Sequence, residues 1–196
     1  MLEHFNTQLF LFLNAPAGVH GILLWTVTAI AEWLIWLVPA GLTVLWLFGK
    51  LEDQRAAVKA LVAGLIALGV NQLIAMLWFH PRPFMAGIGH TYLPHVADSS
   101  FPSDHVTLLL SVGLALWTTD SILARRLAGV LLAISPLVAW ARIYLGVHFP
   151  LDMVGAFGVA TSVLVLVNTV KGKNTCYKLA EMFEGMFAMA FGRKRS

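Results

Sequence analysis

The sequence predicts an all-α integral membrane protein, a bundle of five membrane-spanning helices with interfacial helices at both ends. Its 196 residues are 59% hydrophobic and only 12% charged, and the mean hydropathy is +0.79. The charged fraction is about half of the roughly 25% that soluble domains carry. Several apolar runs also reach the ~20 residues that a helix needs to cross the hydrocarbon core. The length fits a single domain, and a lone cysteine, Cys176, excludes an internal disulfide framework.

Five apolar runs are predicted as membrane spans. The first lies within residues 21–48, with its firmest part at 33–48, and the others cover residues 58–79, 103–124, 127–145 and 151–170. Glu32 interrupts the first run, so residues 19–30 are alternatively a separate, partly inserted helix. No cleavable signal peptide is expected, because no basic region precedes a short apolar core at the N-terminus.

Both ends of the chain are predicted to lie along the membrane surface. Residues 1–14 mix apolar and polar side chains in a way that suits an interfacial helix, and a sixth span is the alternative. Residues 179–191 carry apolar side chains at helical spacing among basic residues, which indicates an amphipathic helix on the cytoplasmic surface; a mobile tail is the alternative. The chain thus divides into a membrane domain, residues 1–170, and a basic amphipathic tail, residues 171–196.

The basic residues predict the orientation in the membrane. Eleven of the thirteen Lys and Arg residues fall on one side, which the excess of positive charge marks as cytoplasmic. The other side keeps only Arg82 and Arg142. It also holds all seven histidines: His4, His20, His80, His90, His95, His105 and His148. We therefore expect the functional groups to face the outer side of the membrane, opposite the cytoplasm.

Three polar clusters lie on this outer face, each at the end of a predicted span. They are "HPRPF" at residues 80–84, "FPSDH" at 101–105 and "ARIYLGVHFPLD" at 141–152. Since all three lie at helix ends on the same side, folding of the bundle can bring them together at one depth. The clusters are therefore candidates for a single site.

Two of the residue types in these clusters suit phosphate binding. Arg82 and Arg142 are permanently charged planar forks that match phosphate oxygens. Ser103 lies where a helix begins, and the free backbone N–H groups of a helix N-terminus bind anions. Together they describe a phosphate cradle.

The histidines add the chemistry of phosphoryl transfer. Of His105 and His148, one imidazole can attack phosphorus and the other can protonate the departing oxygen. Asp152 follows His148 by four residues, one helical turn, and can accept its ring N–H. That contact would fix the tautomer of His148 and make the other ring nitrogen more nucleophilic.

Each of these residues has a plainer explanation when it is taken alone. His105 and Ser103 suit helix caps. Arg82 suits an anchor that reaches the lipid headgroups, and Asp152 suits the positive end of a helix dipole. These explanations would have to coincide on one face that contains no further Lys or Arg except Arg142. The set as a whole favours a catalytic site.

The ordered motifs resemble the three-part signature of the type-2 phosphatidic acid phosphatase (PAP2) superfamily, which includes membrane lipid phosphatases and soluble vanadium haloperoxidases. The resemblance covers residues 80–152 and is carried by Arg82-Pro83, Pro102-Ser103-x-His105 and Arg142-x5-His148-x3-Asp152. The small size and the "RPF" and "PSDH" variants look most like the bacterial undecaprenyl pyrophosphate phosphatases of the bacitracin-resistance type.

The resemblance implies a role for each matching residue. His148 would be the nucleophile that forms a phosphohistidine, with Asp152 as its partner, and His105 would be the acid to the leaving group. The phosphate would be bound by Arg82, Ser103 and Arg142. No metal or other cofactor is implied, because the arginines supply the positive charge.

Three positions depart from the pattern of the superfamily. Ala75 replaces a Lys, Asp104 replaces a Gly, and Ala141 replaces a Ser. His80 or His90 is a candidate to make the phosphate contact that the Lys would make. Asp104 would repel phosphate if it faced the site, so we expect it to cap the helix or to face another cation. His80 and Asp104 are therefore included among the candidate substrate-binding residues.

The resemblance implies the cleavage of undecaprenyl pyrophosphate to the monophosphate and inorganic phosphate at the outer leaflet of a bacterial inner membrane, with the active site facing the periplasm. Alternatives are phosphotransfer from the polyprenyl carrier to another lipid such as lipid A, and hydrolysis of phosphatidylglycerol phosphate or phosphatidic acid. A lipid-binding or transport protein is the non-enzymatic alternative, although a transporter would place its charges nearer mid-membrane. The expected partners are a polyprenyl pyrophosphate lipid and the bilayer, with no nucleic acid.

Overall fold

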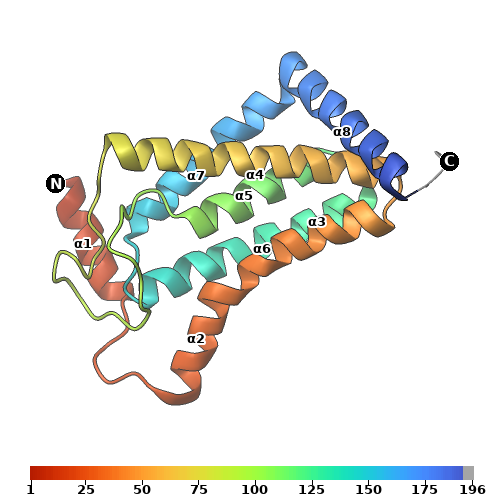
Figure 1. The fold of residues 1–196 in the computed structure, drawn as a ribbon. Helices are drawn as coiled ribbons and strands as arrows, with labels where there is room; N and C mark the ends of the chain where they lie inside the picture. The colour runs from red at the N-terminus through yellow and green to blue at the C-terminus, as the bar shows by residue number, and fades with distance from the viewer. Residues whose placement is uncertain (192–196) are drawn as a thin grey trace.

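The structure, a computed structural model, describes residues 1–191 and contains only helices and loops within them (Figure 1). This confirms the predicted all-α class. The elements are α1 (Leu2–Leu13), α2 (Gly21–Trp33), a 3-10 turn η1 (Leu34–Trp36), α3 (Leu37–Phe48), α4 (Leu51–Leu77), α5 (Asp104–Trp117), α6 (Ile122–Tyr144), α7 (Pro150–Asn168) and α8 (Val170–Phe191).

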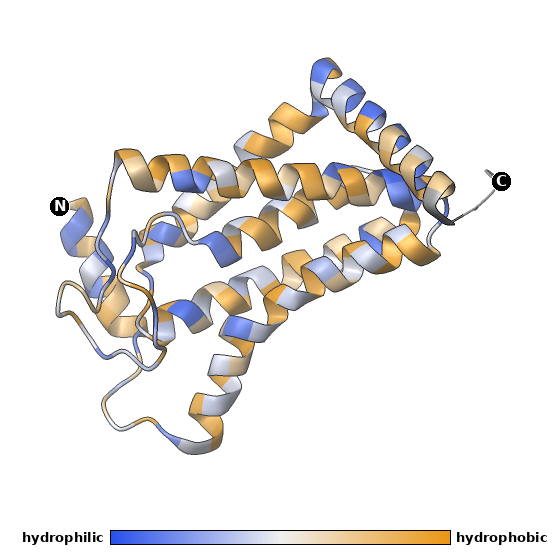
Figure 2. Ribbon diagram, in the orientation of Figure 1, coloured by the Kyte–Doolittle hydropathy of each residue, from blue (hydrophilic) through white to orange (hydrophobic). Residues whose placement is uncertain are grey.

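Four apolar helical stretches are long enough to cross a membrane. They are Gly21–Phe48, Leu51–Leu77, Ile122–Tyr144 and Pro150–Asn168. They correspond to the first, second, fourth and fifth predicted spans. In agreement with this pattern, hydrophobic residues dominate the lengths of the helices in Figure 2. The protein is an integral membrane protein.

The third predicted span, residues 103–124, is shorter than expected. Helix α5 has 14 residues, about 21 Å at 1.5 Å per residue, and ends at Trp117. The helix ends here because the next residues are polar: the hydroxyls of Thr118 and Thr119 bond back to carbonyls of the last turn, and Ser121 caps α6 by accepting from the N–H of Ala124. The apolar residues that follow Ser121 therefore belong to α6.

Helix α5 is central to the bundle, which explains how a short helix is accommodated. It packs against α4, α6 and α7, and its buried apolar side chains belong to the main hydrophobic core. A helix enclosed by its neighbours does not have to match the thickness of the lipid. The length of α5 is therefore set by its packing against the neighbouring helices.

The first span is broken next to Glu32, as the alternative prediction allowed. Helix α2 ends at Trp33, and η1 separates it from α3. In Figure 1 α2 diverges from the bundle at this point, whereas α3 continues alongside it. Residues at the break and residues at the start of α5 line one cavity, which is described with the site below.

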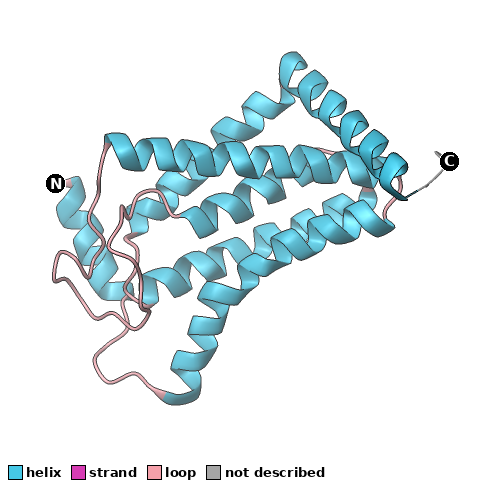
Figure 3. Cartoon of the chain, viewed as in Figure 1, coloured by secondary structure: helices cyan, strands magenta, loops and turns pink. Residues whose placement is uncertain are grey.

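Helix α1 lies at the end of the bundle where the long loops gather (Figure 3). Its 12 residues span about 18 Å, less than the thickness of the hydrocarbon core, which favours the predicted interfacial helix over the alternative of a sixth span. The side chain of Asn6 accepts from the N–H of Leu151 at 3.0 Å, and Phe10 packs edge-on against Phe149. Helix α1 thus supports the start of α7.

Helix α8 begins at Val170, earlier than the predicted 179–191, and folds back across the bundle. Phe183 and Phe187 pack against Trp46, and Glu184 lies 3.5 Å from Arg55 of α4. The tail is therefore a packed helix over its described residues, in place of the alternative mobile tail. The basic residues Arg193–Arg195, which contributed to the predicted orientation, lie outside the described residues.

The fold predicts a large contribution of α5 packing to stability. Leu109→Ala removes a fully buried side chain from the main core and should lower the free energy of unfolding by about 2–5 kcal/mol. Leu65→Ala on α4, where the leucine is 62% exposed, is the matched control and should change it by less than about 0.5 kcal/mol. Denaturant titration in mixed micelles measures both. Equal effects of the two substitutions would contradict a central α5.

Candidate active site

The three polar clusters of the sequence meet at one end of the bundle. Arg82 lies in the loop between α4 and α5, and Ser103 and His105 lie at the start of α5. Arg142 is in the last turn of α6, and His148 directly precedes α7. The two loops that carry the clusters are among those that gather at the left of Figure 3.

His148 and Asp152 form a buried pair. The Nδ1 of His148 lies 3.1 Å from Oδ2 of Asp152, and the two side chains are 2% and 0% exposed. The local sequence produces this geometry: Pro150 begins α7, and Asp152 in its first turn accepts from the N–H of Phe149 at 2.8 Å. Ser100 donates a further hydrogen bond to the same carboxylate oxygen. The pair is thus held from two sides of the site.

Arg82 holds the other nitrogen of His148. Its Nη1 lies 3.2 Å from Nε2 of His148 and 2.8 Å from the carbonyl of Val147. Because a guanidinium only donates, Nε2 must carry a lone pair. The ring proton is therefore on Nδ1, which donates a hydrogen bond to the carboxylate of Asp152. Burial lowers the pKa of His148 to about 4, although Asp152 opposes the shift. The ring is therefore neutral at pH 7, with its lone pair on Nε2.

Arg142 is buried and only partly hydrogen-bonded. Its Nη1 donates to the carbonyl of Ala31 at 3.3 Å, and its Nη2 lies 3.2 Å from Nε2 of His95. Its Nε is buried and has no hydrogen-bond partner among residues 1–191. A buried donor without a partner is costly, so this N–H is available to a bound anion.

Ser103 also presents a free polar group. It occupies the N-cap position of α5, but its hydroxyl makes no capping bond and is buried without a partner within the described chain. Its N–H donates to the carbonyl of Asp152 at 3.3 Å. The simple capping role is therefore absent, and the hydroxyl is free to bind a ligand.

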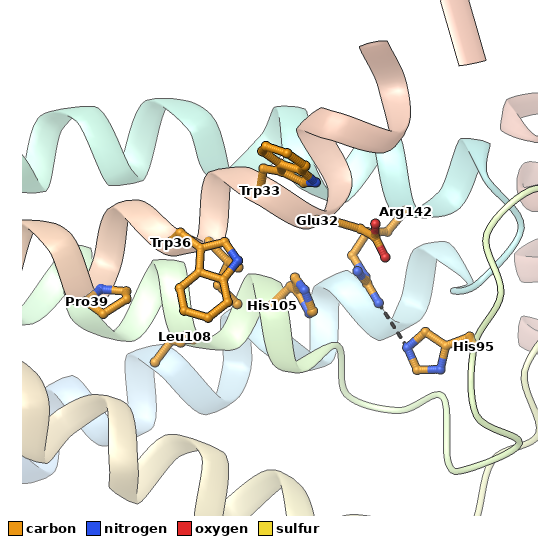
Figure 4. A pocket seen from close by; sticks show the side chains of 9 residues that line it. Glu32, Trp33, Trp36, Pro39, His95, His105, Leu108 and Arg142 are labelled. Atoms are coloured by element: carbon orange, nitrogen blue, oxygen red, sulfur yellow. Dashed lines mark hydrogen bonds between the residues drawn. The ribbon is translucent and has the colours of Figure 1, made fainter. Parts of the chain in front are cut away.

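A cavity of about 580 Å³ lies between Arg142 and the broken first span (Figure 4). Its polar wall contains His105, Arg142, His95 and Glu32. Its apolar wall is formed by Trp33, Ile35, Trp36, Pro39 and Leu108. A charged or phosphorylated headgroup and an apolar chain can both be accommodated in such a space.

Two of the predicted substrate-binding residues make other contacts. The carboxylate of Asp104 accepts from the side-chain amides of Asn71, at 2.7 Å, and Gln72, at 3.4 Å, so it faces α4. The ring of His80 lies against Trp78 and Phe149, with centroids 5.7 and 6.0 Å away. Neither contact involves the arginines of the site.

Sequence reasoning did not single out His95, Asp98 and Ser100. All three lie in the loop between α4 and α5, and they contact Arg142, Arg82 and Asp152 respectively. The sequence contains only a weak indication of them: His95 and Asp98 are polar residues on a face with few charges.

His90, the other candidate for the phosphate contact of the missing Lys, is exposed, and its backbone N–H and carbonyl form hydrogen bonds with the side chain of Asn14.

The arrangement has the parts of a phosphoryl-transfer site. It offers a neutral buried imidazole with an oriented lone pair, two guanidinium groups, a free hydroxyl and a second histidine, His105, on the wall of the cavity. No cluster of three or more His, Cys, Asp or Glu side chains suited to a metal ion occurs among residues 1–191.

Comparison with known proteins assigns the family. The model of the PAP2 superfamily matches residues 56–176, which include all the candidate site residues. The chain belongs to the PAP2 superfamily. This PAP2 protein is a membrane phosphatase, as the motifs predicted.

Its relatives and structural neighbours agree. This PAP2 protein is 37% identical over 155 residues to YbjG of Escherichia coli (strain K12), and the aligned region covers 79% of this chain and 77% of that one. It is 32% identical over 155 residues to BcrC of Bacillus subtilis (strain 168), an undecaprenyl-diphosphatase, over 79% of this chain and 78% of that one. The crystal structure of Aquifex aeolicus LpxE superposes with a TM-score of 0.61 at 20% identity, covering 83% of this chain and 93% of that one.

The pH profile of turnover should report the pKa of His148. Since that pKa is about 4 and not the ordinary 6.5, the ring stays neutral as the pH falls to ~5. As the pH falls further, through about 4, the ring gains a proton and loses the Nε2 lone pair. The kcat/KM for nitrophenyl phosphate should therefore fall on the acid side with an apparent pKa near 4.

Asp152→Asn tests the same pair from the other side. It removes the carboxylate that favours the imidazolium, so the acid limb should move to lower pH, and the plateau should fall by about 10²-fold or more. Unfolding temperatures measured at each pH separate loss of activity from loss of structure. A wild-type limb near pH 6.5 would contradict a buried, neutral His148.

Proposed function

We propose that this chain hydrolyses undecaprenyl diphosphate to undecaprenyl phosphate and inorganic phosphate at the outer leaflet, through a phosphohistidine on His148. The observation that carries the proposal is the buried His148, held by Asp152 on Nδ1 and by Arg82 on Nε2. The names of the relatives suggest the substrate, because the 32% identical BcrC is an undecaprenyl-diphosphatase.

The first half-reaction forms the phosphoenzyme. The Nε2 lone pair of His148 attacks the distal phosphorus, and the bond from that phosphorus to the bridging oxygen breaks. Arg82 exchanges its bond to Nε2 for a phosphate oxygen, while the free groups of Arg142 and Ser103 bind further oxygens. His105 gives a proton to the departing undecaprenyl phosphate.

The second half-reaction releases the phosphate. His105, now without its proton, takes a proton from water, and the water oxygen attacks phosphorus as the bond from phosphorus to Nε2 breaks. The products are inorganic phosphate and free His148, and both histidines return to their starting states. The carboxylate of Asp152 stabilises the positive charge on the His148 ring while the phosphohistidine exists.

The shape of the cavity supports a lipid substrate. Its polar end contains His105 and Arg142, and its apolar wall includes Trp33 and Trp36, which are 70% and 69% exposed. These tryptophans lie at the break of the first span, where α2 diverges (Figure 4). We propose that the diphosphate enters at this side and that the isoprenoid chain remains against the tryptophans.

The two histidine roles predict different patterns of loss. His148→Ala should abolish turnover on every substrate and form no acid-labile phosphoprotein, because the attacking nitrogen is gone. His105→Ala should depend on the leaving group. A phosphate monoester, with a second pKa of about 6, leaves readily from undecaprenyl diphosphate, whereas phosphatidic acid must release a much more basic alkoxide. We expect a loss of ~10²–10⁴-fold on phosphatidic acid and a clearly smaller loss on undecaprenyl diphosphate and nitrophenyl phosphate.

The measurement is single-turnover kinetics of the purified full chain in detergent, with EDTA present. Phosphoprotein that still forms in His148→Ala would overturn the assignment of the nucleophile, and equal losses on all three substrates would overturn the role of His105. Faster wild-type turnover of phosphatidic acid or phosphatidylglycerol phosphate than of undecaprenyl diphosphate would overturn the proposed substrate. A requirement for added Mg²⁺ would contradict the metal-free mechanism.

The proposed orientation predicts which end reacts with an impermeant thiol reagent. In a Cys176→Ala background, Ala86→Cys lies in the exposed loop of the site end, and Asp120→Cys lies at the opposite end. In cells whose outer barrier is permeabilised, only the cysteine at position 86 should be labelled. If the cysteine at position 120 is labelled in these cells, and the cysteine at position 86 reacts only after the inner membrane is lysed, the topology is the reverse of the proposed one. An outer-leaflet substrate would then be excluded.

A further inference from the structure

We propose that His95 is a positioning residue of the phosphate site, whose neutral ring holds the guanidinium of Arg142 so that its free Nε can bind a phosphate oxygen. No motif marked this histidine, and it lies outside the three clusters of the sequence. The inference deepens the proposed function and rests on its assignment of Arg142 to phosphate binding.

His95 is brought to the site by the loop between α4 and α5. Its half-buried ring lines the same cavity as His105 and Arg142, and its contact with Arg142 is the dashed line in Figure 4. The ring centroid lies 6.4 Å from that of His148. His95 is therefore next to the space that a phosphate on His148 would occupy.

The hydrogen bonds of His95 fix its tautomer. Nδ1 lies 3.1 Å from the carbonyl of Val96, which can only accept, so Nδ1 carries a proton. Nε2 lies 3.2 Å from Nη2 of Arg142, which can only donate, so Nε2 carries a lone pair. A ring with one N–H and one lone pair is neutral. In agreement, burial lowers the pKa of His95, and the charges of Arg82 and Arg142 add to that effect.

A neutral acceptor has a different consequence from a charged one. Both acceptors of Arg142, the Ala31 carbonyl and His95, are uncharged, so they orient the guanidinium without neutralising it. Arg82, in contrast, donates its Nε to the carboxylate of Asp98 at 2.8 Å. Glu32 lines the same cavity as Arg142, but the hydrogen bonds of the Arg142 guanidinium go to uncharged acceptors, and its Nε has no partner within the described chain. Arg142 is therefore the site arginine whose donors are the more available to an anion.

His95 and Asp98 act from one short segment of loop. They are three residues apart, and each provides an acceptor to one of the two site arginines. Two buried guanidinium groups in one site repel each other, so an acceptor for each is needed to set their orientation before substrate arrives. Removing the acceptor from Arg142 should let its side chain leave the orientation that fits phosphate.

The test compares variants that keep or remove the acceptor at position 95. His95→Ala removes it, and His95→Phe removes it while keeping the volume of the ring. His95→Gln keeps an amide oxygen that can accept from Arg142. We expect both apolar variants to weaken binding of inorganic phosphate about 10-fold, since hydrogen bonds to charged groups are the stronger kind, and His95→Gln to stay within about 3-fold of wild type. Calorimetry on the purified full chain measures the Kd.

A double-mutant cycle shows whether His95 acts through Arg142. In an Arg142→Ala background, His95→Ala should cause no further loss of kcat/KM for nitrophenyl phosphate. His4→Ala, at an exposed histidine of α1, is the matched control and should change neither the Kd nor kcat/KM. Unfolding temperatures of all variants show whether each is folded.

The outcomes separate this inference from the proposed function. A wild-type chain that binds phosphate and turns over, with His95→Ala and His95→Phe equal to it, overturns the role of His95 alone. Additive losses in the cycle, or a His95→Gln variant as weak as His95→Ala, overturn it as well. A wild-type chain that neither binds phosphate nor turns over a phosphate ester overturns both.

Discussion

The carboxylate of Asp152 is the point at which the fold and the site depend on each other. One carboxylate oxygen, Oδ2, accepts from the ring of His148, the N–H of Phe149 and the hydroxyl of Ser100. The backbone carbonyl of Asp152 accepts from the N–H of Ser103. These donors come from the start of α7 and from the loop before α5. The other oxygen, Oδ1, is buried without a partner among residues 1–191, so the buried carboxylate depends on the donors to Oδ2 and requires both segments to be in place.

The rest of the site follows from that constraint. With Nδ1 of His148 committed to Asp152, Nε2 is turned towards Arg82 and the space in which phosphorus must lie. Arg82 is in turn held by Asp98 and by backbone carbonyls of Ser99 and Val147. The site is thus preorganised by hydrogen bonds within the protein, and a phosphate has to replace only some of them.

The membrane fold was largely predictable because its cause is local composition. Long apolar runs have few alternatives in a bilayer other than helices, and the four long helical stretches occur where hydropathy placed them. The errors occurred where tertiary packing decides. The apolar run at residues 103–124 continues past the end of α5, and only the hydroxyls of Thr118, Thr119 and Ser121 end one helix and start the next. The start of α8 at Val170 likewise depends on its packing across α4.

For the site, the sequence by itself determined the motif residues and their spacing. His148 and Asp152 are one helical turn apart, so their contact follows from the helix, and the cluster positions at helix ends place Arg82, Ser103 and Arg142 at one depth. Only the tertiary structure decided which residues of the α4–α5 loop meet them. Loops have no periodicity that fixes a direction for each side chain, so the contacts of His95 with Arg142, of Asp98 with Arg82 and of Asp104 with Asn71 come from packing of segments distant in sequence.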